Sequence, residues 1–226
     1  YHGGYIDDLA QAIVLLDPAI LNLPVAEQLN EFRERAYVAQ LQEQKDVLAN
    51  FGTKFDVWFS EMSLHASGAV EHGLEKLRAQ GHVFEVDDAT CLRTTDFGDD
   101  KDRVLVKSGG VLTYFSSDTA YYINKRERGF EICIYMLGAD HHGYVNRLRA
   151  VAACAGDNPD YNIHVLIGQL VKIMEGGEEV KLSKRAGTII TIAELVVKVG
   201  VDASRYSLIR YPVDTPMVLD VVVYIG

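Results

Sequence analysis

The sequence predicts an α/β fold that contains a parallel sheet. In its second half, apolar runs of strand length alternate with amphipathic segments of helix length, which is the pattern of strand–helix–strand units. The apolar run at 132–137 ends in a glycine and a carboxylate, a helical segment follows at 144–155, and another apolar run follows at 161–167. Since ligands bind at the carboxyl ends of parallel strands, we expect a site where the first run ends.

Two helices are expected at the N-terminal end. Apolar residues recur at helical spacing in 6–16 and again in 25–48, and two X-Pro steps separate the segments. After residue 50 the helical spacing of apolar residues gives way to short apolar strings typical of strands. We therefore expect 1–50 to be a helical connecting segment and 51–226 to be the main part of the fold.

The segment that follows is expected to form one strand, one helix and a set of hairpins. The apolar string at 56–59 is interpreted as a buried strand, and 64–80 as a helix. Short strands then fill 82–114, with turns at 98–100 and 108–110.

The last elements are expected to include further helices and a hairpin. Residues 116–128 are predicted to be helical, and the glycine pair at 176–177 predicts a hairpin turn. Thr191 and Glu194 have the spacing of a capping box that starts a short helix. Asp202 is expected to cap the last helix.

Composition indicates a soluble globular protein with one main domain. The 226 residues are 48% hydrophobic and 24% charged, which allows a substantial core. No apolar run reaches the roughly 18 residues that cross a bilayer, and the first residues do not resemble a secretory signal. We therefore expect a cytoplasmic protein that does not enter the membrane.

Charge and cysteine content exclude two further classes of site. The formal net charge of −10 argues against a broad nucleic-acid surface on this chain, because phosphate contacts need clustered Lys and Arg. Cys91, Cys133 and Cys154 are odd in number, widely spaced and without metal-ligand spacing. We expect reduced core thiols and no metal site built from protein ligands.

The first motif that carries chemistry is Gly138-Ala139-Asp140-His141-His142, at the end of the apolar run. Gly138 would let a ligand approach the backbone, Asp140 could accept hydrogen bonds from ribose hydroxyls, and His142 could stack on a nucleoside. The alternative stays open on the residues alone: Gly138 makes a turn, Asp140 caps a helix, and one histidine is a surface residue.

The second motif is the basic loop at 181–187, which lies between the predicted hairpin and the capped helix. Lys181 and Lys184 supply mobile point charges suited to phosphate oxygens, and Ser183 stands between them. The two ammonium groups could follow charge that moves onto a leaving pyrophosphate. The alternative is a solvated basic turn.

These motifs, about forty residues apart on an α/β background, resemble the C-terminal half of the class I aminoacyl-tRNA synthetase fold. The basic loop looks like that class's K-M-S-K-S signature, with Leu for Met and Arg for the final Ser. Four longer strings resemble bacterial arginyl-tRNA synthetases: F-D-V-W-F-S-E at 55–61, T-Y-F-S-S-D at 113–118, G-A-D-H-H-G-Y at 138–144 and L-S-K-R-A-G-T at 182–188. The resemblance covers essentially the whole chain. It implies a Rossmann-like parallel sheet with a helical and hairpin insertion.

The resemblance also implies an arginine pocket. An arginine side chain is a planar, permanently charged fork of five donors, so a selective pocket needs carboxylates. The family strings assign Glu61, Tyr114 and Asp118 to it, and a spacing of four puts Tyr114 and Asp118 on one helix face. On the residues alone, the carboxylates could instead serve helix starts, and Tyr114 could belong to the core.

The implied reaction joins arginine to ATP, with Mg²⁺, and then transfers arginine to tRNA(Arg). Catalysis would rest on positioning and on electrostatic stabilisation of the reacting phosphorus. The residues implied to bind ATP are Gly138, Asp140, His142 and Lys184. The residues implied to act on its phosphates are Lys181, Ser183 and Lys184.

The family's H-I-G-H motif does not occur in this sequence. We therefore expect the chain to be an inactive fragment of a monomeric parent enzyme. Two alternatives stay open: another class I nucleotidyl-transfer relative with a different amino-acid pocket, and a non-catalytic paralogue that keeps an arginine or nucleotide pocket. An H-I-G-H motif upstream in the same reading frame would favour the synthetase.

Overall fold

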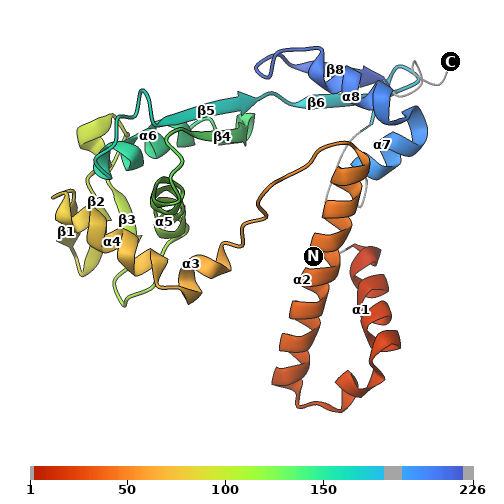
Figure 1. The fold of residues 1–226 in the computed structure, drawn as a ribbon, viewed down its shortest axis with the longest axis horizontal. Helices are drawn as coiled ribbons and strands as arrows, with labels where there is room; N and C mark the ends of the chain where they lie inside the picture. The colour runs from red at the N-terminus through yellow and green to blue at the C-terminus, as the bar shows by residue number, and fades with distance from the viewer. Residues whose placement is uncertain (1–2, 181–189, 221–226) are drawn as a thin grey trace. The chain divides into compact units, whose positions relative to one another are not determined.

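A computed structural model describes residues 3–180 and 190–220 of the chain. They divide into two compact units (Figure 1). The first unit takes its described residues from 1–56, 171–212 and 217–226, and the second unit consists of 57–170 and 213–216. The boundary expected near residue 50 stays a prediction.

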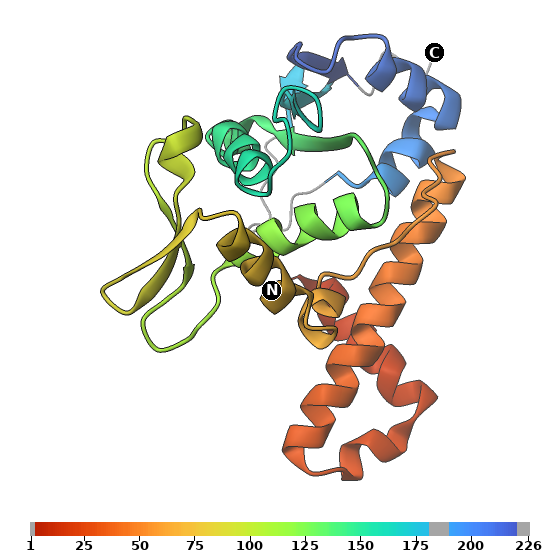
Figure 2. The same cartoon turned by 60° about the vertical axis from the view of Figure 1, so that its left-hand side comes forward.

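The first unit begins with a helical hairpin. α1 (Gly4–Leu16) and α2 (Val25–Asn50) lie side by side in Figures 1 and 2, joined through the 3-10 turn η1 (Pro18–Asn22). The Asp17 side chain starts that turn by accepting a hydrogen bond from the Ala19 N–H, and Asp17 also pairs with Arg35 of α2 at 2.9 Å. The two predicted N-terminal helices are confirmed.

The same unit contains a three-stranded sheet and two short helices. Its elements are β6 (Val171–Glu175), β7 (Glu178–Glu179), α7 (Ile192–Val199), α8 (Val201–Ile209) and β8 (Met217–Asp220). The strand order is β7-β6-β8, with β6 and β8 parallel and the predicted glycine turn between β6 and β7. The capping box of Thr191 and Glu194 is confirmed. The cap predicted at Asp202 is wrong, because Gly200 ends α7 and is already the N-cap of α8.

The second unit contains an antiparallel sheet of three short strands. These are β1 (Val83–Val86), β2 (Ala89–Leu92) and β3 (Arg103–Val106), in the order β1-β2-β3. The turns predicted at 98–100 and 108–110 are present, with positive φ at Gly98, Gly109 and Gly110. The β1–β2 turn at Asp87-Asp88 also has positive φ, at 49° and 60°, and lacks the usual Asn-Gly signature of such turns.

Two predictions about residues 56–80 are wrong. The expected helix at 64–80 is two helices, α3 (Met62–Ala66) and α4 (Ala69–Ala79), because Gly68 lies between them with φ of 75°. Residues 56–59 pair with no strand among the described residues. Phe59 instead stacks on Tyr121 of α5 (Tyr114–Glu127), with 4.5 Å between ring centroids, so the last residue of this apolar string packs on a helix.

A parallel strand pair and its helices form the main core. β4 (Cys133–Gly138) pairs in parallel with β5 (Ile163–Gly168), and α6 (Tyr144–Cys154) connects them. This confirms the predicted strand–helix–strand order and the α/β fold class. α4 packs closely on α5, because Gly73 has no side chain: a Cβ there would lie 3.3 Å from the Ala120 Cα.

Only one face of β4 is covered by the described residues. Cys133 is buried in the core, but Ile134 and Met136 are 60% and 74% exposed. The prediction that both faces of this strand are covered is therefore wrong for the part of the chain described. All three cysteines lie in that part and are free and buried, as expected, and burial raises the pKa of Cys154 to about 12.

A partly buried carboxylate ties α5 to the end of α6. Asp157 accepts hydrogen bonds from the Tyr122 hydroxyl at 2.7 Å and from Arg126 Nε and Nη2 at 2.9 and 3.0 Å. Burial opposes its ionisation, but the bonds from Arg126 and Tyr122 outweigh burial and lower the pKa of Asp157. The ionised carboxylate therefore stabilises the second unit.

We predict that Asp157→Asn lowers the free energy of unfolding by about 2–4 kcal/mol at neutral pH, because it leaves Arg126 partly buried without its charge partner. The folded-state pKa is below the unfolded value of about 4, so this stabilisation is present above pH 4 and lost as the pH falls. Denaturant unfolding at several pH values measures the difference. The control is Asp160→Asn, since Asp160 is an exposed partner of Arg149 and should contribute little. Equal effects of the two substitutions would contradict the prediction.

Candidate functional site

Two cavities lie in the second unit. One is lined by residues predicted to bind arginine, and the other by residues of the turn that follows β4. The first, here the α5 cavity, has a volume of about 550 Å³, and its wall includes Glu61, His65, Lys107, Tyr114 and Ser117. The second, here the α6 cavity, has a volume of about 370 Å³. Its wall includes Asp99, Arg103, Asp140, His141, Tyr144 and Arg147.

Glu61 and Tyr114 share the wall of the α5 cavity. Tyr114 is the first residue of α5 and is 90% exposed, so the alternative that it belongs to the core is wrong. Glu61 stands at the N-cap of α3, where its side chain makes no capping bond within the described structure. Both polar groups are therefore available to a ligand in this cavity.

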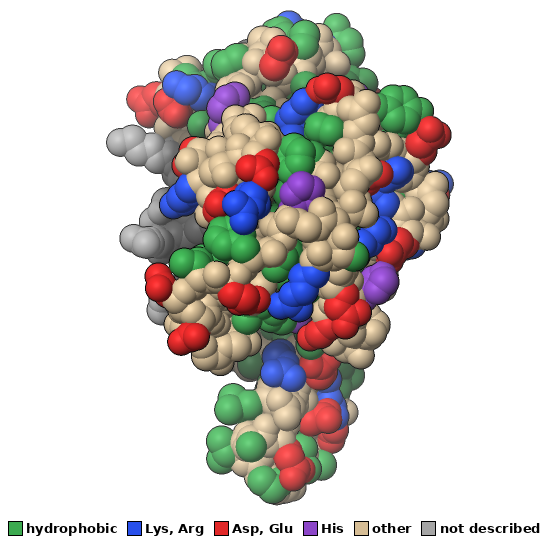
Figure 3. Space-filling view, turned by 90° about the vertical axis from the view of Figure 1, so that its left-hand side faces the viewer, with side chains coloured by type: hydrophobic (Ala, Val, Ile, Leu, Met, Phe, Trp, Pro, Cys, Tyr) green, Lys and Arg blue, Asp and Glu red, His purple; other side chains and the backbone are tan. Residues whose placement is uncertain are grey.

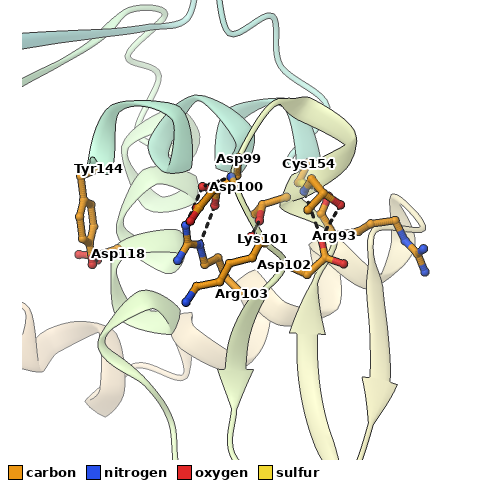
Figure 4. A network of polar contacts seen from close by, with 11 residues as sticks. Arg93, Asp99, Asp100, Lys101, Asp102, Arg103, Asp118, Tyr144 and Cys154 are labelled. Carbon is orange, nitrogen blue, oxygen red and sulfur yellow. Dashed lines mark hydrogen bonds and ion pairs between the residues drawn. The ribbon is translucent and has the colours of Figure 1, made fainter. Parts of the chain in front are cut away.

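Asp118 lies one turn after Tyr114 on α5, as the spacing predicted, but it does not line the α5 cavity. Its Oδ2 accepts a hydrogen bond from the Tyr144 hydroxyl at 3.3 Å, and Figure 4 shows the two side chains pointing toward one another. Burial raises the pKa of Asp118, the bond from Tyr144 opposes this, and the negative charge of Glu61 raises it further. Two carboxylates that repel each other favour a cation between them.

A half-buried cation, which no sequence motif indicates, lies further along the same helix. Lys125 Nζ lies 3.8 Å from the ring centroids of both Tyr121 and Tyr135. Burial lowers the pKa of Lys125 to about 8. Its spacing of seven from Asp118 indicates a shared helix face, but the sequence does not show the contact with Tyr135 on β4.

The end of β4 is shaped by close contact between Gly138 and Asp140. A Cβ on Gly138 would lie 2.7 Å from Asp140 Oδ1, so a larger residue here would displace the exposed Asp140 side chain. Gly138 also pairs with Gly168 at the end of β5, so two glycines meet where the parallel strands end. The Asp140 side chain is 79% exposed, and α6 begins after Gly143 without a side-chain cap within the described residues. The alternative that Asp140 caps this helix is therefore wrong.

The two histidines of this turn have different surroundings. His141 lines the α6 cavity, where its Nε2 lies 3.7 Å from Asp140 Oδ2 and its ring meets the Tyr144 ring edge-on at 6.2 Å. His142 is exposed and does not line this cavity. No local sequence pattern distinguishes His141 from His142.

The α6 cavity has a fixed charged wall opposite the β4 turn. Arg103 donates two hydrogen bonds of 2.7 Å to the buried carboxylate of Asp99 and also pairs with Asp100 (Figure 4). Burial opposes the ionisation of Asp99, but the bonds from Arg103 and Asp100 lower its pKa well below the usual range. These charges are already paired, so they shape the cavity more than they offer free ligand contacts.

The predicted phosphate-binding residues Lys181, Ser183 and Lys184 lie outside the described residues. Within the described ranges, no group of three or more His, Cys, Asp or Glu side chains is arranged to hold a metal ion. No helix in 3–180 or 190–220 is both long enough and apolar enough to cross a membrane. Acidic and basic side chains are interspersed over the face seen in Figure 3.

Comparison with known proteins identifies the family of this chain. The family model described as "tRNA synthetases class I (R), catalytic domain" matches residues 22–208. The arginine–tRNA ligases of Paenarthrobacter aurescens and Frankia alni are each 53% identical to the chain over 220 residues, or 97% of the chain. The chain spans 39% and 40% of the length of these two relatives.

Solved structures show the same likeness. A crystal structure described as an arginyl-tRNA synthetase from Campylobacter jejuni matches 98% of the chain and 48% of its own, with a TM-score of 0.88 and 29% identity. The Thermus thermophilus arginyl-tRNA synthetase matches 97% of the chain and 47% of its own, with a TM-score of 0.62 and 17% identity, which shows the fold alone. The chain therefore belongs to the class I arginyl-tRNA synthetases and carries part of their catalytic domain.

Proposed function

We propose that the chain is the amino-acid-selecting part of a longer arginine–tRNA ligase, which activates arginine with ATP and transfers it to tRNA(Arg). The observation that carries this proposal is the arrangement of Glu61, Tyr114 and Asp118. The side chains of Glu61 and Tyr114 have no structural role within the described residues, and Asp118 is half-buried beside the charge of Glu61. A role in binding a cation explains the position of these side chains better than a role in stabilising the fold.

The proposed pocket matches a guanidinium in charge and shape. Two carboxylates can receive the planar fork of donors from two sides, and a charge-assisted pair of this kind is directional. The Tyr114 ring, exposed at the start of α5, can pack on the guanidinium or its aliphatic stem. The cation would also relieve the repulsion between Glu61 and Asp118.

We propose that the turn at the end of β4 takes part in ATP binding in the complete ligase, and that residues of the basic loop at 181–187 act on the ATP phosphates. Gly138 and Asp140 would hold the ribose, with His142 against the nucleoside, while Lys181, Ser183 and Lys184 would bind the phosphates. Mg²⁺ would enter as part of the substrate, bound to the ATP phosphates. The reaction then depends on placing the arginine carboxylate against the α-phosphate and on stabilising the charge that develops there.

We propose that the reaction takes place in the cytoplasm, where tRNA is charged. With a net charge of −10 and mixed charges on the face in Figure 3, this segment offers little electrostatic attraction to RNA. We therefore propose that other parts of a longer, monomeric ligase supply most of the tRNA contacts, and that the isolated 226-residue chain forms no adenylate.

We predict that the complete ligase charges tRNA with arginine and rejects lysine by at least about a thousandfold in kcat/KM. A lysine ammonium is a point donor that cannot span Glu61 and Asp118, so one of the two carboxylates would stay unpaired in the complex. Aminoacylation kinetics with both amino acids measure this ratio. Comparable charging of lysine would contradict the assigned specificity, and no charging of either would favour a non-catalytic binding protein.

We predict that Asp118→Asn weakens arginine binding by roughly 10- to 100-fold without destabilising the fold. The folded-state pKa of Asp118 is raised, so its ionised form is disfavoured in the folded state at neutral pH, and neutral Asn should keep or raise the Tm. The stability gain should vanish near pH 3, where the carboxyl is protonated in both states. The control is Asp140→Asn, an exposed carboxylate that should leave arginine affinity unchanged. Unchanged arginine binding in Asp118→Asn would contradict the assignment.

A further inference from the structure

Tyr144 joins the two halves of the candidate site. It is the first residue of α6 and directly follows the Gly138–Gly143 turn at the end of β4. Its hydroxyl donates to Asp118 Oδ2 on α5 at 3.3 Å (Figure 4). One side chain therefore links the turn proposed to bind adenosine to the carboxylate proposed to bind arginine.

The Tyr144 ring is held in place by its neighbours. The Arg147 guanidinium, one turn further along α6, lies 4.1 Å from the ring centroid, and His141 meets the ring edge-on with 84° between the ring planes. A ring packed in this way has few alternative positions. Its hydroxyl is consequently a fixed donor, and the Asp118 carboxylate it contacts is restricted as well.

We propose that Tyr144 is a positioning residue of the arginine pocket, which orients the Asp118 carboxylate so that its other oxygen can bind the substrate guanidinium. The inference rests on the proposed function, because Asp118 matters here as the arginine-binding carboxylate. It adds a residue to that pocket that neither the spacing of the motifs nor the wall of the α5 cavity identifies. Tyr144 acts through Asp118 and is assigned no contact with the substrate.

The charges around Asp118 explain why this bond affects binding. Burial and Glu61 favour the protonated carboxyl, whereas Tyr144 and Arg147 from α6 and Lys125 from α5 favour the carboxylate. Removing the Tyr144 hydroxyl takes away one group that favours the carboxylate. Burial and Glu61 then raise the pKa of Asp118 further. Because only the carboxylate binds a guanidinium well, arginine binding in the variant should fail at a higher pH than in the wild type.

The test is Tyr144→Phe in the complete ligase, with aminoacylation kinetics measured from about pH 5.5 to 8. We expect the KM for arginine to rise about 5- to 10-fold near pH 6 and less at pH 8. The acid limb of kcat/KM for arginine should move up by about 0.5 to 1 pH unit, with the KM for ATP unchanged. Only the difference between the pH profiles of the variant and the wild type is diagnostic, because groups that the substitution leaves in place act on both proteins alike.

The matched control is Tyr161→Phe, which removes a tyrosine–carboxylate bond of 2.8 Å to Glu131 outside the site and should change neither KM nor the pH profile. A second variant, Arg147→Met, uncovers the Tyr144 ring and removes a positive charge facing Asp118, and should raise the arginine KM in the same direction.

An unchanged arginine KM and pH profile in Tyr144→Phe would overturn the positioning role while leaving the ligase function intact. A uniform loss of kcat at every pH with a lowered Tm would reduce Tyr144 to a structural residue. If Tyr144→Phe does not fold, an unchanged arginine KM in Arg147→Met overturns the role instead. Failure of the wild-type ligase to charge arginine would overturn the proposed function and this inference with it.

Discussion

The parallel pairing of β4 with β5 is the constraint on which the candidate site depends. Two parallel neighbours need a crossover between them, and α6 supplies it. The first residue of α6, Tyr144, therefore lies shortly after the end of β4. α5 packs on the same core and brings Asp118 to the start of α6. The register of the pair sets Gly138 beside Gly168. A slip of this register would move the turn that holds Asp140 away from α5.

Local sequence signals predicted much of the fold. The N-terminal helices, the glycine turns and the Thr191 capping box follow from spacing and turn chemistry, and the structure has all of them. The errors arise where distant contacts decide the outcome. The string at 56–59 is as apolar as a buried strand, yet Phe59 stacks on Tyr121 of a helix more than sixty residues away along the chain. Likewise, no local sequence pattern predicts that one face of β4 is exposed in the described structure. The residues on that face, Ile134 and Met136, are of the types usually found in buried strands.

The candidate site shows the same division. The family strings identified Glu61, Tyr114 and Asp118, and helical spacing placed the last two on one face, as the structure has them. Neither signal shows that Asp118 is turned toward α6, because that depends on how two helices pack on one sheet. Tyr144 is the last residue of the family string at 138–144 and Arg147 follows it, but no sequence pattern indicates a role for either. Their relation to Asp118 becomes visible only in three dimensions.

A structure of the complete ligase with bound arginine tests the central claim most directly. The account predicts that the guanidinium lies within about 3 Å of carboxylate oxygens from both Glu61 and Asp118, with Tyr114 against the side chain. Asp118 should keep its bond from Tyr144 in that complex. An arginine side chain held by other carboxylates, with Glu61 and Asp118 both facing solvent, would contradict the account.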